Sequence, residues 1–98
     1  MGYNGFMSDQ MIVDIAQILR KRGAVEASLF GSVARGDYRS DSDVDLLVKF
    51  DRNKKTSLFD LVSIQEELEK KIGRRVDLIT KLNKYVEPYV KADLRKII

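Results

Sequence analysis

The stretch from Leu29 to Phe50, LFGSVARGDYRSDSDVDLLVKF, constrains the fold of this 98-residue chain more than any other part of it. Apolar and polar side chains alternate with period two from Asp43 onward, which predicts a strand over Asp43–Phe50. The apolar side chains that share one face of this strand are Val44, Leu46, Val48 and Phe50. Asp43 and Asp45 share the other face, with Cα atoms about 6.6 Å apart at the usual rise of a strand.

Two carboxylates on one face of a strand can hold two divalent cations about 3.5–4 Å apart. Gly31 and Ser32 end the preceding apolar run, and a glycine turn can bring backbone N–H groups close to a phosphate. The chain contains no Cys and no His, so a bound metal must have oxygen ligands, which favours Mg²⁺ or Mn²⁺. A phosphate-binding turn facing a carboxylate pair is typical of phosphoryl or nucleotidyl transfer.

Two other motifs are partly matched in this stretch, but each lacks required residues. Asp41, Asp43 and Asp45 have the spacing of the first ligands of an EF-hand calcium loop. Leu46 stands where the turn glycine belongs and Arg52 where the bidentate Glu belongs, which excludes that loop. A P-loop is excluded because its Lys and Ser/Thr are missing after the glycines. A lone Asp-x-Asp is usually only a solvated strand start, but here a Gly-Ser turn precedes the pair.

Periodicity and capping signals predict the remaining elements. In chain order these are a helix from Ser8 to Arg22, a strand over Ala24–Phe30, the strand Asp43–Phe50, a helix over Leu58–Ile72, a strand over Arg75–Thr80 and a final helix from Pro88. Ser57 caps the start of the Leu58–Ile72 helix and Gly73 ends it. The final helix has Val90, Leu94 and Ile97 on one face. We therefore expect an α/β fold, with one domain over residues 1–98 in which a small mixed sheet is covered by helices.

These residues resemble the minimal nucleotidyltransferase (MNT) family of the DNA polymerase beta-like superfamily. The family pattern is a hydrophobic residue, Gly, Gly or Ser, a spacer of about ten residues, then Asp, an apolar residue, and Asp or Glu. The matching positions are Phe30, Gly31, Ser32, the spacer 33–42, Asp43, Val44 and Asp45. The family variant Gly-Ser-x-Ala-Arg-Gly is matched by Gly31–Gly36. The resemblance implies the nucleotidyltransferase palm as the fold.

The resemblance also implies roles for further residues. Asp77, in an otherwise apolar strand, matches the family's third carboxylate, and we favour a role as metal ligand over the alternative of an exposed face shared with Arg75. Ser32 matches a residue that contacts the nucleotide phosphates, although it could merely end the strand. Arg35 could neutralise a triphosphate or be an ordinary surface charge.

The implied activity is transfer of a nucleotide, with ATP as substrate and two Mg²⁺ ions held by the catalytic carboxylates Asp43, Asp45 and Asp77. Gly31, Ser32 and Arg35 would bind the triphosphate. Small MNT proteins are typically antitoxins encoded beside HEPN-domain toxins, and some transfer AMP to a toxin tyrosine. The resemblance therefore implies a HEPN partner in a hetero-oligomer.

Two alternatives stay open, namely a non-catalytic antitoxin that only binds its toxin, and a transferase that acts alone on a small molecule or RNA. The net charge of +3 is compatible with anionic substrates but does not argue for direct nucleic-acid binding. No apolar run approaches the length of a membrane span and no signal peptide is evident, so we expect a cytoplasmic protein without membrane contact.

Overall fold

The computed structural model describes the chain except for residues 1–8, 32–42, 54, 82–83 and 86. Its elements are α1 (Asp9–Lys21), β1 (Ala24–Phe30), β2 (Val44–Phe50), α3 (Leu58–Ile72), β3 (Val76–Ile79), α4 (Glu87–Asp93) and β4 (Arg95–Lys96). Within the described residues, the strands form one four-stranded sheet in the order β3-β2-β1-β4. β2 runs antiparallel to β1 and parallel to β3, and β4 runs antiparallel to β1. The predicted small mixed sheet is confirmed.

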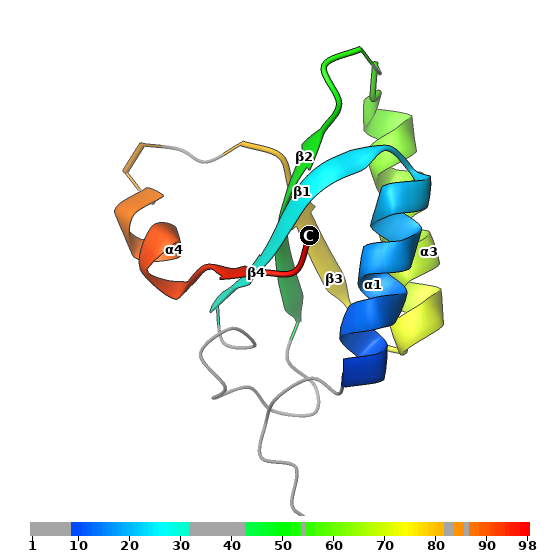
Figure 1. Ribbon diagram of the computed structural model, residues 1–98, viewed down its shortest axis with the longest axis horizontal. Helices are drawn as coiled ribbons and strands as arrows, with labels where there is room; N and C mark the ends of the chain where they lie inside the picture. Colours follow the sequence, from blue (N-terminus) through cyan, green and yellow to red (C-terminus); the bar gives the residue numbers. More distant parts are fainter. Residues whose placement is uncertain (1–8, 32–42, 54, 82–83, 86) are drawn as a thin grey trace, which may run out of the picture.

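The core lies between this sheet and a layer formed by α1 and α3, whereas α4 lies on the opposite side of the sheet (Figure 1). The largest fully buried side chains among the described residues come from both layers: Ile15, Leu19, Leu29, Val44, Leu46, Val48, Ile64 and Leu68. The alternation predicted for β2 is confirmed because Val44, Leu46 and Val48 are buried against the helices, while Asp45 and Leu47 between them are more accessible. The face that carries Asp45 is called the open face below.

Both ends of α3 form where the sequence predicts. Ser57 Oγ accepts a hydrogen bond from the N–H of Asp60 at 3.1 Å, and the Asp60 carboxylate accepts the N–H of Ser57 at 2.9 Å. This reciprocal capping box satisfies two N–H groups that have no partner inside the helix. At the other end Gly73 adopts a left-handed conformation, and its N–H donates to the carbonyl of Glu69 at 2.8 Å.

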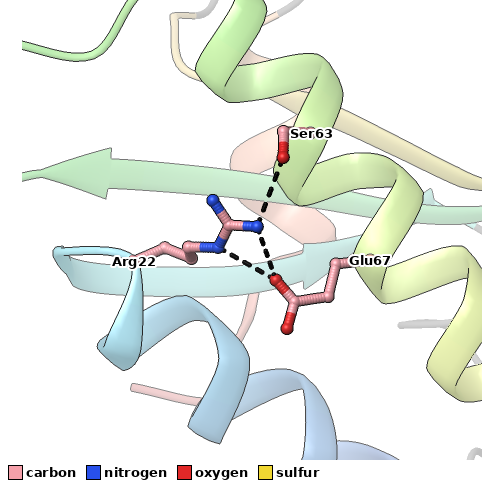
Figure 2. A network of polar contacts seen from close by, with 3 residues as sticks. All are labelled: Arg22, Ser63 and Glu67. Carbon is pink, nitrogen blue, oxygen red and sulfur yellow. Dashed lines mark hydrogen bonds and ion pairs between the residues drawn. The ribbon is translucent and has the colours of Figure 1, made fainter.

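A polar network joins the two helices of the layer, and no sequence pattern revealed it. Figure 2 shows Arg22, which follows α1, reaching across to two residues of α3. Its Nη2 lies 2.7 Å from Glu67 Oε1, and its Nε donates to the same oxygen at 2.9 Å. Nη2 also donates to Ser63 Oγ at 3.2 Å. Because both charged side chains are only about one-third exposed, this contact holds the helix layer together better than a fully solvated pair would.

The prediction for the C-terminal segment is wrong beyond residue 93. The last helix was expected to continue through Leu94 and Ile97, but α4 ends at Asp93, and β4 then pairs with β1. The N–H groups of Ile97 and Ile98 both donate to the carbonyl of Ala27, at 2.9 and 3.2 Å. The physical reason is that β1 needs backbone partners on its outer side, and both isoleucines pack against the core there.

Candidate active site

Asp45 and Asp77 lie at the same level on neighbouring strands. β2 and β3 are parallel, and their register pairs Asp45 with Asp77. One residue earlier Val44 pairs with Val76, and both valines are buried on the helix-covered face. Alternation along each strand therefore places both aspartates on the open face. Since neighbouring strands lie about 4.8 Å apart, the two carboxylates start from adjacent backbone positions.

Asp43 lies at the same end of the sheet, immediately before β2. It is exposed, and the N–H of Val44 next to it already bonds to the carbonyl of Arg75, at 2.8 Å. An extended chain places Asp43 on the same side as Asp45, two residues later. The predicted strand began at Asp43 and the observed one begins at Val44, a difference that is usual at the end of an element.

Gly31 brings the end of β1 against the Asp45 carboxylate. It has a φ of +73°, which disfavours any residue with a side chain. A Cβ at this position would collide with Asp45 Oδ2 and lie 3.3 Å from Cγ. The register agrees with this contact, because Phe30 pairs with Asp45 across β1 and β2. The glycine of the sequence motif and the second aspartate are therefore in direct proximity.

A groove of about 480 Å³ opens on the same face, between the sheet and α4. Its walls include Leu47 and Lys49 from β2, Ser28 from β1, and Leu94 after α4. Leu47 follows Asp45 by two residues on the same face, but Asp43, Asp45 and Asp77 are not among the described residues that line the groove. Sites for small molecules commonly have volumes of about 300–1,000 Å³, so a nucleoside or an aromatic side chain has room here.

The metal-binding role of Asp43, Asp45 and Asp77 stays a prediction. Among the described residues, no three His, Cys, Asp or Glu side chains are close enough together to hold a metal ion. Carboxylates without a cation repel one another, and a bound cation is what draws such groups together. The donor set nevertheless fits Mg²⁺ or Mn²⁺, because it consists of carboxylate oxygens at one end of one face, in a chain without His or Cys.

The other predicted phosphate-binding residues, Ser32 and Arg35, lie outside the described residues, so their roles also stay predictions.

One side chain near the site was missed. Glu69 of α3 accepts the N–H of Val76, directly before Asp77, at 2.9 Å. The only signal in the sequence was a glutamate one turn before the Gly73 stop, which is also common on solvated helix faces.

Comparison with known proteins decides the family. The family model described as "Nucleotidyltransferase domain" matches residues 12–97. The chain belongs to this family. It is 38% identical over 91 residues to MJ1379, a candidate protein adenylyltransferase of Methanocaldococcus jannaschii, and the match covers 85% of this chain and 90% of that protein. The resemblance to minimal nucleotidyltransferases is thereby confirmed, and the chain is a nucleotidyltransferase.

Solved structures support the same fold. A structure of a candidate minimal nucleotidyltransferase is 33% identical, with a TM-score of 0.74 over 88% of each chain. A second structure is a tri-AMPylated HEPN toxin of Shewanella oneidensis in complex with an MNT antitoxin. It matches with a TM-score of 0.73 over 94% of this chain and 72% of that chain, and at 17% identity this likeness shows the fold alone. Within the described part of the chain, no helix is both long and apolar enough to cross a membrane.

Proposed function

We propose that this nucleotidyltransferase is a metal-dependent antitoxin that transfers AMP from ATP to a tyrosine of a HEPN-domain toxin. The observation that carries the proposal is the pairing of Asp45 with Asp77, with Gly31 against the Asp45 carboxylate. The names of the relatives support the choice of AMP and of a HEPN partner. The protein acts in the cytoplasm as a single domain, in a hetero-oligomer with the toxin and without direct contact to nucleic acid.

The reaction is an in-line displacement at the α-phosphorus of ATP. The tyrosine oxygen forms a bond to that phosphorus, the bond from phosphorus to the pyrophosphate breaks, and the hydroxyl proton leaves to Asp77 or to water. When bound, two Mg²⁺ ions supply the positive charge that stabilises the triphosphate and the attacking oxygen. Asp43 and Asp45 hold the metal end of the site, and Gly31, Ser32 and Arg35 orient the phosphates.

The acceptor comes from the partner. The open face carries Asp45 and, further along β2, the groove lined by Leu47 and Lys49, whereas the other face of the sheet is covered by α1 and α3. Catalysis requires the acceptor oxygen within about 3–3.5 Å of the phosphorus. A tyrosine presented by a folded toxin, approaching from the open face, can meet this requirement while the toxin supplies the rest of the positioning surface.

The second candidate is an antitoxin that binds its toxin without catalysis. This candidate predicts that the toxin is inhibited equally with and without nucleotide, so nucleotide dependence separates the two functions. The third possibility, a transferase acting alone, predicts nucleotide transfer in the absence of any partner protein.

The test uses two forms of ATP, radiolabelled at the α- or at the γ-phosphate, together with Mg²⁺ and the HEPN protein encoded beside this chain. We expect the α-label on the partner and no γ-label, because AMP is transferred and pyrophosphate leaves. Appearance of the γ-label alone would identify phosphorylation and contradict the proposal.

The same assay tests Asp77. We expect Asp77→Asn to reduce transfer by about 100-fold or more, since it removes a metal-binding and proton-accepting oxygen from the site. Its melting temperature should stay near that of the wild type, because the side chain is exposed. Glu66→Gln, which removes the same charge from an exposed position of α3, is the matched control. Wild-type transfer by Asp77→Asn would mean that Asp77 is only a surface residue.

A further inference from the structure

The strand that carries Asp77 has few backbone interactions of its own. β3 is four residues long and lies at the edge of the sheet, so β2 is its only strand neighbour among the described residues. Three residues separate it from the end of α3. Burial of Val76 and packing of Leu78 against the core favour the observed register, but a four-residue edge strand has few backbone hydrogen bonds to reinforce it. A slip by one residue would turn Asp77 from the open face to the helix-covered face, because side chains alternate along the strand.

Glu69 of α3 gives β3 an additional hydrogen bond at its first residue. Its Oε2 accepts the N–H of Val76 at 2.9 Å in a partly buried position. The acceptor is a carboxylate oxygen, and such charge-assisted hydrogen bonds are stronger than neutral ones. The N–H of the first residue of β3 is therefore bonded to a side chain of the helix layer.

Glu69 is itself fixed by its backbone. Its carbonyl accepts the N–H of Gly73 at the end of α3, at 2.8 Å. On the other side of the same segment, the carbonyl of Arg75 accepts the N–H of Val44 from β2, also at 2.8 Å. The backbone just before Asp77 is thus held by the helix through Glu69 and by the sheet through Val44.

We propose that Glu69 is a positioning residue that locks the register of β3 and so holds Asp77 beside Asp45. The inference rests on the proposed function, in which Asp77 binds metal, and adds a residue that acts through the backbone and touches neither metal nor nucleotide. Outer contacts that orient metal ligands commonly change metal affinity or activity by about 10–100-fold when they are removed.

The first readout does not depend on function. Amide hydrogen exchange of Val76, followed by NMR, should accelerate by about tenfold or more in Glu69→Ala, because the N–H loses a charged acceptor. Glu69→Gln should restore slow exchange, since the amide oxygen of Gln can accept the same hydrogen bond. The control is Glu67→Ala, which lies in the same helix and breaks the contact with Arg22 but does not touch β3.

The second readout is the affinity for Mn²⁺ in the presence of a non-hydrolysable ATP analogue, with AMP transfer measured beside it. Glu69→Ala should weaken Mn²⁺ binding and slow transfer by about tenfold each. Glu69→Gln should recover both, and Glu67→Ala should leave Mn²⁺ affinity within about twofold even if it melts earlier.

Three results would overturn the inference: unchanged Val76 exchange in Glu69→Ala, faster exchange with unchanged Mn²⁺ affinity, or equal losses of affinity in Glu69→Ala and Glu67→Ala. The last would reveal general loss of stability. If the wild-type protein neither binds Mn²⁺ with the analogue nor transfers AMP, the proposed function fails, and the exchange data then decide separately whether Glu69 holds β3.

Discussion

At the scale of single residues, Gly31 explains why the motif needs a glycine where β1 ends. Its positive φ and its close approach to the Asp45 carboxylate are two separate reasons why a side chain at this position is unfavourable.

The sequence indicated that Gly31 and Asp45 belong to one motif, and that Asp43 shares a face with Asp45. It could not place Asp77 opposite Asp45, because the register of a parallel strand pair depends on contacts between distant segments. Only the family resemblance suggested that pairing.

Mutation can separate the effect of the positive φ at Gly31 from the effect of its contact with Asp45. Gly31→Ala should lower the free energy of unfolding by about 1–2 kcal/mol through its positive φ, and should also displace the Asp45 carboxylate and reduce AMP transfer. Gly73→Ala is the matched control, because Gly73 has nearly the same φ, +70°, and apart from its two chain neighbours no described residue comes within 4 Å of the added Cβ. Chemical denaturation and transfer rates measured side by side test this. Equal loss of activity in the two variants would show that the contact with Asp45 does not matter.

At the scale of elements, local signals determined most boundaries. α3 and β1 have the predicted bounds. For α3 the reason is that Ser57 and Gly73 satisfy the helix ends with short-range hydrogen bonds. β4 could not be predicted, since Arg95–Lys96 is too short to show a period. The contacts of Arg22 with Glu67 and of Glu69 with Val76 were also missed, because nothing in the spacing of charged residues tells which distant groups will meet.

The cap of α3 provides a test at this scale. Ser57→Ala removes the acceptor for the N–H of Asp60 and should lower the free energy of unfolding by about 1 kcal/mol. For a domain of this size, that corresponds to a decrease of about 4–8 °C in melting temperature. Ser63→Ala, on the exposed side of the same helix, is the comparison and should have a smaller effect. A Ser57→Ala protein that melts with the wild type would show that the capping box does not stabilise this helix.

At the scale of the whole molecule, the residues that form the core and the candidate site lie on opposite faces of the sheet. The α1–α3 layer and the buried strand faces form the core, while the open face carries the aspartates and the groove. A partner that brings an acceptor must therefore approach the open face. The fold class and the positions of Asp43 and Asp45 could be predicted from the sequence, whereas the groove could not, because it depends on where α4 packs against the sheet.

The central claim is that this protein transfers AMP to a tyrosine of its HEPN partner. Its most direct test is the intact mass of the partner after incubation with this protein, ATP and Mg²⁺, with the ribonuclease activity of the partner measured alongside. We expect the mass to increase in steps of one AMP, on a tyrosine identified by peptide mapping, while the ribonuclease is silenced. Asp45→Asn protein, or omission of Mg²⁺, should give no increase. A partner that is bound and inhibited but gains no mass with any nucleotide would contradict the account and favour the binding antitoxin.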